Sequence, residues 1–353
     1  YQASEKTLAG YMMGTFDIGP KFQMTTGVRV EHNWFEAETP LFDPVNVPLG
    51  DRAPTFRTDK NDYTEVLPGI HFRYEASNRV VFRAAYTNTY GRPAFREMVA
   101  VTQFDDVNNI ITTGNPELEP YTAKNYDLSM EYFGATTYFQ LALFHKRVSN
   151  FVLEQGDTID GADGYRGLPL NPGETYTVTT FSNQHESVNK GVELAARYRF
   201  AKLPEPFSSL YVDGSATYTD SDGRYADRPG EKLPTYGASE WLFNMGVGFD
   251  RGRMSAQLSY RYRSPYLEGL ESVDRQNREL GFTPDSGDDW WGEQKYWNWE
   301  SSYRLSRNYR LYLNVTNLFE YTNVGYQSPP KNRYPEDSYF HQRRWSFGIK
   351  GSF

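Results

Sequence analysis

The sequence has no cysteine among its 353 residues, which excludes disulfide bonds, thiolate metal sites and cysteine catalysis. It also lacks any run near the roughly 18 to 20 apolar residues that a membrane-spanning helix needs. Acidic residues outnumber basic ones, 45 to 37, and the net charge of −8 argues against a nucleic-acid partner, because phosphate binding needs a basic surface. The first residues, YQASEKTLAGYM, contain no charged region followed by an apolar stretch and a cleavage site, so no secretory signal is visible.

What the sequence has in abundance is aromatic residues, 16% of the chain, arranged with a period of two. At the C-terminus Trp345, Phe347, Ile349 and Phe353 fall on one face of a strand, and charged, small or polar residues fall on the other. The same alternation recurs along the chain and predicts about thirteen strands. They lie near residues 5–17, 20–34, 62–75, 79–90, 122–133, 136–149, 187–200, 208–220, 237–250, 252–264, 293–305, 308–318 and 341–353.

The predicted connections alternate strictly between short and long. Short turns lie at 17–21, 75–79, 133–136, 201–207, 250–253 and 305–308. Long segments lie at 35–61, 91–121, 150–186, 221–236, 265–292 and 319–340. Outer-membrane barrels have short periplasmic turns and long extracellular loops, so the chain is predicted to be a meander with two unequal rims.

A soluble β-sandwich or soluble barrel would also alternate. Here, however, the face opposite the apolar one repeatedly carries Arg, Glu, Lys and Gln, as at Glu193, Arg197 and Arg261. Thirteen strands are also too many for a filled soluble barrel, because about eight already fill the interior. We therefore predict an all-β chain that forms an antiparallel transmembrane β-barrel.

The predicted strand number is odd, whereas single-chain bacterial barrels have even numbers. With a periplasmic C-terminus, the first strand would begin on the outside, and such a barrel cannot close properly. We therefore expect residues 1–353 to be the C-terminal part of a larger barrel.

Several motifs resemble TonB-dependent outer-membrane receptors, and they occur in that family's order. GNPELEPYTAKNYDLSMEYF at 114–133 is similar to a family loop that leads into a strand. VLPGIHFRYEAS, VVFRAAYTNTYGRPAFREM, KGVELAARYRF and NVTNLFE resemble other family strands, and Phe353 matches the terminal aromatic. The long NPELEP segment before NYDL is most similar to the subgroup abundant in relatives of Xanthomonas and Caulobacter.

The resemblance implies a 22-stranded barrel in the outer membrane of a Gram-negative bacterium, filled by an N-terminal plug and energised by TonB. No plug and no TonB box is present in this sequence, so the plug and the first strands would lie outside it. Partners implied are outer-membrane lipid, the plug, TonB, a small-molecule substrate and the barrel-assembly machinery. The residues that resemble the assembly signal are Trp345, Phe347, Ile349 and Phe353.

No enzyme motif is present, so we expect neither catalysis nor a cofactor. The five histidines are scattered without an HxH or HExxH pair, which leaves a metal-hydrolase site little support. The segment 156–165, GDTIDGADGY, places Asp157, Asp160 and Asp163 where they could offer oxygen ligands to calcium. Their spacing does not fit an EF-hand, and a solvated acidic loop is the preferred interpretation.

The candidate ligand-binding residues are led by two tryptophans of DDWWGEQKYWNW at 288–299. Trp297 and Trp299 share the lipid-facing parity and are assigned to an aromatic girdle, which leaves Trp290 and Trp291 to stack on a sugar or a siderophore. Weaker candidates are Tyr266, Arg92 and Tyr334. Acidic loops favour neutral saccharides slightly over anionic ferric siderophores. A passive porin and a protein-binding barrel stay open as alternative functions.

Overall fold

A computed structural model describes residues 1–41, 55–105, 107–225, 228, 230–270, 288–327 and 334–351. Thirteen strands form one continuous antiparallel path, in which each long strand pairs with the next long strand along the chain. They are β1 (Gln2–Asp17), β2 (Phe22–Leu41), β3 (Thr55–Ser77), β4 (Val80–Gly91), β7 (Tyr121–Phe133), β8 (Thr137–Asp160), β9 (Thr175–Arg199), β10 (Leu210–Arg224), β11 (Trp241–Arg251), β12 (Met254–Arg263), β15 (Gln294–Arg304), β16 (Tyr309–Thr316) and β19 (Arg344–Gly351). The predicted all-β antiparallel meander is confirmed, strand by strand.

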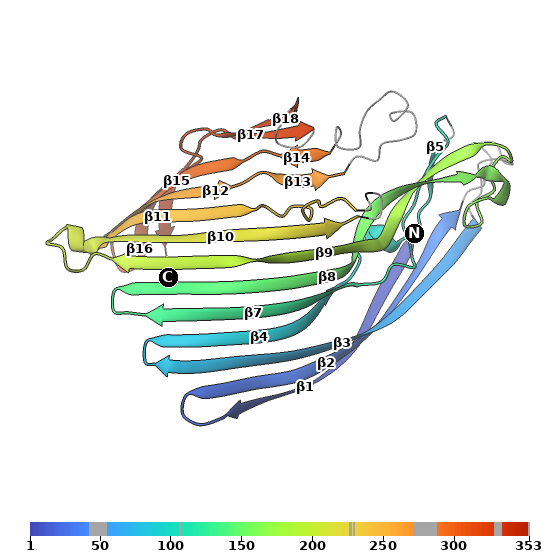
Figure 1. Cartoon of the computed structure of the whole chain (residues 1–353). Coiled ribbons are helices and arrows are strands. Elements are labelled where there is room, and N and C mark those ends of the chain that lie inside the picture. Colours follow the sequence, from blue (N-terminus) through green and yellow to red (C-terminus); the bar gives the residue numbers. More distant parts are fainter. Residues whose placement is uncertain are drawn as a thin grey trace.

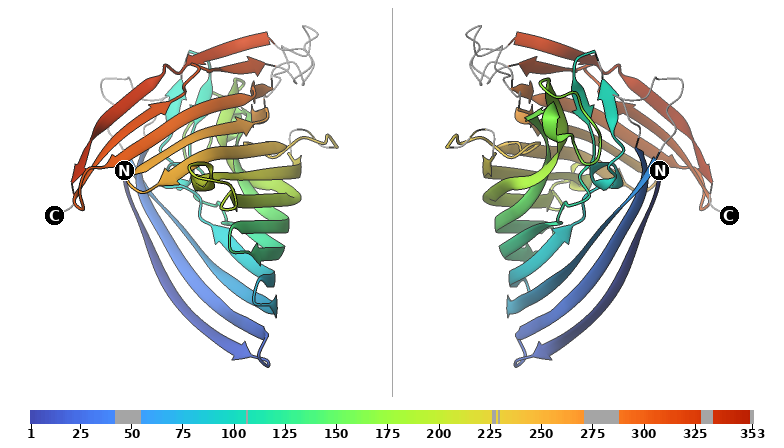
Figure 2. Two further views of the ribbon diagram at one scale, coloured as in Figure 1. Left: turned by 90° about the vertical axis from the view of Figure 1, so that its left-hand side faces the viewer. Right: turned by 90° about the vertical axis from the view of Figure 1, so that its right-hand side faces the viewer.

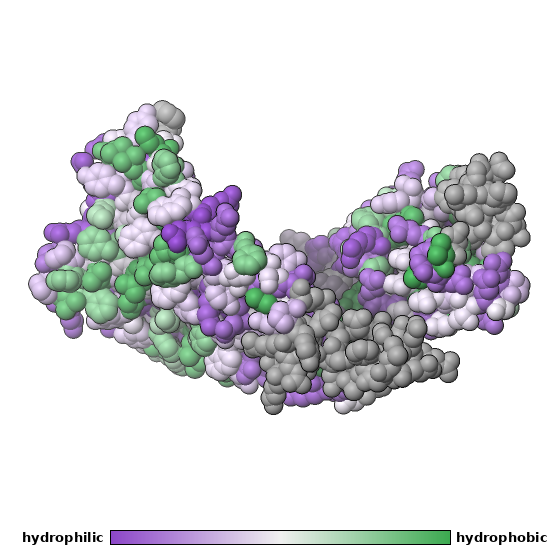
Figure 3. Space-filling view, turned by 90° about the horizontal axis from the view of Figure 1, so that it is seen from above, coloured by the Kyte–Doolittle hydropathy of each residue, from purple (hydrophilic) through white to green (hydrophobic). Residues whose placement is uncertain are grey.

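The sheet is curved, and its two ends differ. Figure 1 shows the short turns at the left and the long connections at the right, as the alternation of lengths predicts. Figure 2 shows that the sheet bends across its strands into an open trough, which is the shape of a barrel wall. Seen from above, apolar residues gather toward the short-turn side (Figure 3). We call the concave side of this trough the inner face and the convex side the outer face.

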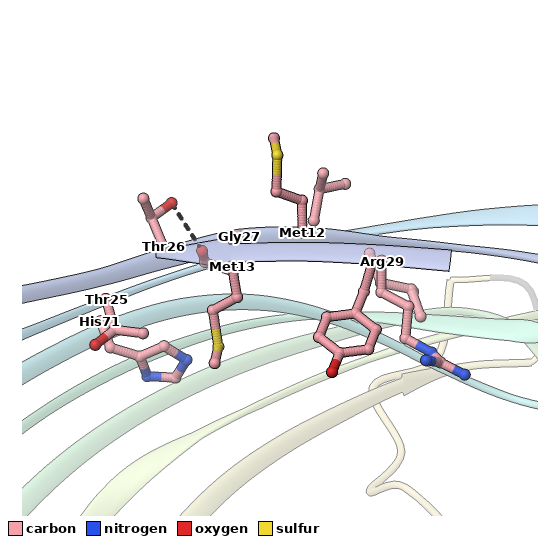
Figure 4. A pocket seen from close by; sticks show the side chains of 11 residues that line it. Met12, Met13, Thr25, Thr26, Gly27, Arg29 and His71 are labelled. Carbon is pink, nitrogen blue, oxygen red and sulfur yellow. Dashed lines mark hydrogen bonds between the residues drawn. The ribbon is translucent and has the colours of Figure 1, made fainter. Parts of the chain in front are cut away.

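Side chains alternate between these two faces along every long strand. Met12 and Met13 point to opposite sides of β1 (Figure 4). On the outer face, Val30 lies opposite Val66 and Leu311 opposite Ile349, so apolar side chains continue from strand to strand. On the inner face, Arg83 lies 3.3 Å from Glu131, as one example of a polar cross-strand pair. This arrangement presents an apolar surface to lipid and a polar surface to the interior.

Two predicted loops are partly strand, and here the predicted boundaries were wrong. β2 and β3 reach into 35–61, and β8 and β9 reach into 150–186. Segments such as TYTVTT at 175–180 carry only a short alternation, with Tyr176 and Val178 on the buried parity and threonines on the other. Outside the long apolar rows a strand face is buried only where another segment packs against it, so the apolar alternation is too short to mark a strand.

The other long connections carry shorter elements. The segment after β4 contains α1 (Phe95–Met98), β5 (Gln103–Asp105) and β6 (Ile110–Thr112), and β6 pairs in parallel with β9. A second sheet contains β13 (Tyr266–Gly269), β14 (Asp289–Trp291), β17 (Thr322–Gln327) and β18 (Tyr334–Phe340) in that order. Within the described ranges, no helix has the length and apolar character to cross a bilayer.

The buried apolar clusters found among the described residues lie in the long connections and the strand extensions. One consists of Phe35, Ala37, Met98, Val99 and Leu118. The other consists of Ile111, Leu168, Leu170, Tyr176 and Val178. Burying a side chain such as Leu118 contributes about 1.5 to 3 kcal/mol. These clusters fasten the segment between β4 and β7 onto the extended hairpins.

Asn115 of the GNPELEP motif fixes the same segment with polar contacts. Its amide nitrogen donates to the Phe181 carbonyl at 2.9 Å, and its amide oxygen accepts from Arg166 at 2.9 Å and from the Glu117 backbone at 3.1 Å. Asparagine suits this position because its side chain bonds the backbone two residues on. The motif therefore has a structural role, which is to dock this connection onto β9.

Gly114 has no room for a larger side chain, so Gly114→Ala is expected to undock the segment. A Cβ here would lie 2.4 Å from the Val99 carbonyl oxygen and 3.0 Å from that of Glu97. Overpacking of this kind costs about 1 to 3 kcal/mol. Hydrogen exchange of residues 110–120 should accelerate. Gly156→Ala is the control because no described atom lies within 4 Å of its Cβ position, and equal protection in the two variants would contradict the prediction.

The residues that resemble an assembly signal lie on an edge strand. Trp345, Phe347 and Ile349 follow each other on the outer face of β19, and their exposed fractions are 57%, 79% and 64%. Within the described strands, β19 pairs only with β16. Phe353 lies outside the described residues.

Candidate ligand-binding site

Four of the five candidate ligand residues belong to the second sheet. Tyr266 on β13 lies opposite Trp291 on β14, and Trp290 lies opposite Leu267 and Tyr326. Tyr334 is on β18, opposite Gln327 of β17. Segments more than 60 residues apart in sequence, 266–269 and 334–340, are thus joined through β14 and β17 on the long-loop side (Figure 1).

The two adjacent tryptophans face opposite sides of this sheet, because side chains alternate along a strand. The Trp291 ring lies 5.1 Å from the Tyr339 ring. Tyr266, on the same face as Trp291, has the Arg263 guanidinium 3.6 Å from its ring centroid, a cation–π contact. Tyr266 and Trp291 are therefore already engaged by neighbouring side chains.

Trp290 lines a pocket of about 510 Å³ between β10, the segment 234–240, residues 264–265 after β12, and β14. Its indole Nε1 is buried and has no hydrogen-bond partner among the described residues, which is uncommon for a native donor. The remaining lining is mostly polar or small: Tyr218, Thr219, Asp220, Ser221, Pro234, Ala238, Glu240, Ser264 and Pro265. An aromatic ring beside hydroxyl and carboxylate groups suits a ligand that presents both a flat apolar face and hydroxyl groups.

The carboxylates of the pocket differ in how far they are neutralised. Asp220 lies 3.2 Å from Lys190 and 3.7 Å from Lys232. Glu240 has no ion-pair partner within 4.0 Å in the described part of the chain. Among the described residues the pocket is therefore not basic, and a strongly anionic ligand would find there no counter-charge other than lysines already paired with Asp220.

The wall of the pocket is held by Tyr225, which follows β10. Its hydroxyl donates to the Pro234 carbonyl at 2.9 Å and accepts from the Tyr236 backbone at 3.1 Å. The two tyrosine rings stack with centroids 5.0 Å apart. Burial raises the pKa of the Tyr225 hydroxyl above its ordinary value, so this side chain stays a neutral donor throughout the physiological range.

A buried ion pair ties the same wall to the strand that carries Trp290. The guanidinium of Arg228 lies 2.5 Å from the Asp288 carboxylate, and the two side chains are only 6% and 4% exposed. Arg228 also contacts Glu231 at 3.1 Å. Asp288 precedes Trp290 by two residues, so this pair positions the tryptophan against the pocket.

Arg92, the fifth candidate, lies in a charged network on the inner face of β1 to β4. Its guanidinium is 3.3 Å from Glu5 and 3.6 Å from Glu31. The Tyr90 hydroxyl accepts from Arg92 at 3.2 Å and donates to Glu31 at 2.6 Å. These contacts join three strands, and they give Arg92 a structural role in addition to any contact with a ligand.

Two other predictions concern the acidic segment 156–165 and the tryptophan pair Trp297 and Trp299. In 156–165, the Asp157 and Asp160 carboxylates accept from the backbone amides of Thr158 and Ala162, both at 2.8 Å, and the Asp163 side chain lies outside the described ones. Among the described residues no group of three His, Asp or Glu could hold a metal ion. As predicted, Trp297 and Trp299 share the outer face, with Trp299 between Leu258 and Val315.

A pocket of about 340 Å³ that sequence reasoning missed lies where β1, β2 and β3 meet. Met13, Arg29 and His71 lie on one side of the strands there (Figure 4). Gly27 allows the close approach, since a Cβ would lie 2.5 Å from the Met12 carbonyl oxygen. Sequence reasoning also missed Thr219, Asp220 and Glu240 of the Trp290 pocket, because ordinary polar residues at strand ends carry no local signal.

A family profile described as "TonB dependent receptor-like, beta-barrel" matches residues 1–318. The iron-regulated outer membrane virulence protein of Vibrio cholerae serotype O1 is 24% identical over 279 residues, which are 75% of this chain and 35% of that protein. The ferric enterobactin receptor PfeA of Pseudomonas aeruginosa superposes with a TM-score of 0.65 at 17% identity, covering 100% of this chain and 54% of that chain. The ferric yersiniabactin uptake receptor FyuA of Yersinia pestis gives 0.62 at 16%, covering 98% and 45%.

At these identities the structural matches show a shared fold. The chain spans about a third of the length of the curated relatives it matches and about half of the solved structures.

Proposed function

Because the chain belongs to the TonB dependent receptor-like β-barrel family, we propose that it is the C-terminal part of a receptor for active nutrient uptake. The barrel lies in the outer membrane of a Gram-negative bacterium. The observation that carries the proposal is the meander of thirteen strands with an apolar outer face, a polar inner face and one rim of long connections. The family is one of receptors, and the proposal assigns the chain no catalytic role.

The complete receptor in this proposal has 22 strands, an N-terminal plug and a contact with TonB that supplies energy. The open trough supports it, since β1 and β19 each pair on one side only within the described sheet and such edges need partners in a membrane. The outer-face row of β19 supports recognition by the barrel-assembly machinery. A passive porin is the second candidate, and it would have the same polar inner face.

Two substrate classes fit different observations. The relatives are named for iron regulation, ferric enterobactin and ferric yersiniabactin, which supports a ferric siderophore. The Trp290 pocket supports an oligosaccharide, because it combines an aromatic ring with hydroxyl and carboxylate groups, and its described lining contains no unpaired cation. The NPELEP segment supports membership of the Xanthomonas and Caulobacter subgroup.

A TonB-dependent receptor and a passive porin differ in whether substrate uptake depends on energy. Uptake of labelled ferric siderophores and of labelled oligosaccharides would be measured in cells that carry the full-length protein, with and without TonB. A receptor should lose saturable uptake of its substrate when TonB is removed. Uptake that proceeds unchanged without TonB and does not saturate would establish passive diffusion instead.

Trp290→Ala is expected to weaken binding of the substrate about tenfold or more, as for an aromatic anchor in a desolvated pocket. The buried Nε1 donor and the ring surface are both lost. Isothermal titration of the purified full-length receptor with a panel of both substrate classes gives the affinities. Trp299→Ala, on the outer face, is the matched control. Unchanged affinity for the transported ligand would remove the pocket from the uptake pathway.

A further inference from the structure

The outer face of β7 to β9 changes from apolar to charged toward the long connections, in successive rows of residues that lie opposite one another. The apolar row consists of Leu128, Leu143 and Val192. Two residues further along the strands, Tyr126 lies opposite His145, with the two rings 5.9 Å apart. The next row on the same face places Lys124 opposite Arg147. This order, apolar, then aromatic, then charged, is the one that a bilayer presents from its hydrocarbon core to its headgroups.

The charged row carries more cations than carboxylates. Lys124 and Arg147 are like charges directly opposite one another, an arrangement that destabilises a sheet. Lys124 is exposed and has no carboxylate within 4.0 Å among the described residues. Arg147 lies 3.2 Å from Glu186, and the same carboxylate is 3.9 Å from Arg224. One carboxylate therefore stands beside three cations here.

A second group of cations lies next to the first on the same face. Lys190 on β9 is opposite Asp220 on β10, and the Asp220 carboxylate is 3.2 Å from Lys190 and 3.7 Å from Lys232. Asp222, two residues further along β10, is a third carboxylate on this part of the face. The five cations thus exceed the three carboxylates by two charges. We call these cations the cationic patch: Lys124, Arg147, Lys190, Arg224 and Lys232.

The position of the cationic patch selects the kind of anion that reaches it. The long connections mark the extracellular side of an outer-membrane barrel, so the patch lies level with the headgroups of the outer leaflet. Its face is continuous with the apolar rows that face lipid. Arginine and lysine are the side chains that bind phosphate, the first as a planar fork and the second as a point charge. A phosphorylated lipid headgroup combines this charge with this location.

We propose that the cationic patch binds the phosphorylated sugar headgroup of lipopolysaccharide, with the acyl chains along the apolar row of Leu128, Leu143 and Val192. The two groups of cations are centred near Glu186 and Lys190, four residues or roughly 13 Å apart along β9. A disaccharide that carries a phosphate at each end reaches both groups. The inference rests on the outer-membrane location of the barrel and is independent of which nutrient is transported.

Retention of lipid by the full-length receptor tests this inference. The receptor would be extracted from native outer membranes, washed in mild detergent, and its bound lipopolysaccharide counted by native mass spectrometry. The triple variant K124Q/R147Q/R224Q should retain about tenfold less, as expected when several charge contacts are lost together. Heat-modified migration on gels confirms that the variant is folded. Equal retention by this variant and the unchanged receptor would overturn the proposal.

The matched control removes the same number of cations from the opposite face. Lys146 is adjacent to Arg147 on β8, and Arg197 and Arg199 are on β9; all three are exposed on the inner face. The variant K146Q/R197Q/R199Q should retain as much lipopolysaccharide as the unchanged receptor. A loss equal to that of K124Q/R147Q/R224Q would show that overall charge, and not the cationic patch, holds the lipid.

A second measurement identifies the group that is bound. Delipidated receptor would be incubated with lipopolysaccharide, with its enzymatically dephosphorylated form, with phosphatidylglycerol, or with lipopolysaccharide in the presence of inorganic phosphate. Intact lipopolysaccharide should bind about tenfold more tightly than the dephosphorylated form, and inorganic phosphate should not displace it. Equal binding of the dephosphorylated form, equal binding of phosphatidylglycerol, or displacement by inorganic phosphate would each overturn the proposal.

Discussion

Arg228→Gln is expected to release the wall of the Trp290 pocket from the strand that carries the tryptophan. The substitution removes the charge that lies 2.5 Å from the Asp288 carboxylate, and that side chain is only 4% exposed. Breaking a buried ion pair by removing one of its charges costs about 3 to 5 kcal/mol. This cost falls on the loop contacts rather than on the barrel wall, because the pair joins the segments 228–240 and 288–294. The population of the detached loop should rise by about two orders of magnitude or more.

Hydrogen exchange of residues 230–240 and 288–293 measures the release, and the exchange of β7 to β9 should stay unchanged. Arg224→Gln is the matched control, since Arg224 is 70% exposed and 3.9 Å from Glu186, a pair worth about 0 to 1 kcal/mol. The double variant R228M/D288L removes both charges and should restore most of the protection. If the Arg228→Gln and Arg224→Gln variants show equal hydrogen exchange in residues 230–240 and 288–293, the buried ion pair does not hold the wall of the pocket.

The barrel wall was predictable from the sequence because the membrane imposes a simple pattern. Lipid requires apolar residues at every second position, so the strand ending in Trp345, Phe347 and Ile349 is visible without any structure. The same logic failed for 35–41 and 150–160, which are strand in β2 and β8. Only a few residues there are apolar on one parity, such as Phe35 and Ala37, because their face is covered by another segment and not by a continuous lipid surface.

The candidate site was predictable only in part, because contacts between segments far apart in the sequence leave no local pattern. The sequence singled out Trp290, Trp291, Tyr266 and Tyr334, and the pairing of β13, β14, β17 and β18 brings their strands together. Period-two alternation separates Trp290 from Trp291, but which face forms a pocket depends on the segment 234–240 packed against it. The Arg228 and Asp288 pair spans 60 residues, and such a contact leaves no local pattern.

Gly191→Ala is expected to destabilise the barrel wall itself, at the centre of the sheet. Gly191 on β9 lies opposite Phe144 on β8 and Thr219 on β10. An added Cβ would lie 2.0 Å from the Tyr218 carbonyl oxygen and 2.6 Å from Phe144 Cζ. Glycine weakens a strand by itself, so its presence here indicates that the neighbouring ring and backbone occupy its side-chain position.

The variant must separate two strands that are paired on both sides, so its cost should reach or exceed the upper end of the usual overpacking range, about 3 kcal/mol. The temperature at which the folded barrel converts to the unfolded form on a heat-modifiability gel should fall. Gly10→Ala on the edge strand β1, where no atom of the described residues lies within 4 Å of the Cβ position, should leave this temperature unchanged. Adding Phe144→Ala to Gly191→Ala should restore only part of the stability, because the Tyr218 carbonyl is still too close. Full restoration of stability in the double variant would mean that the Phe144 ring alone requires glycine at position 191. No loss of stability in Gly191→Ala would mean that β9 and β10 are less closely paired than in this structure.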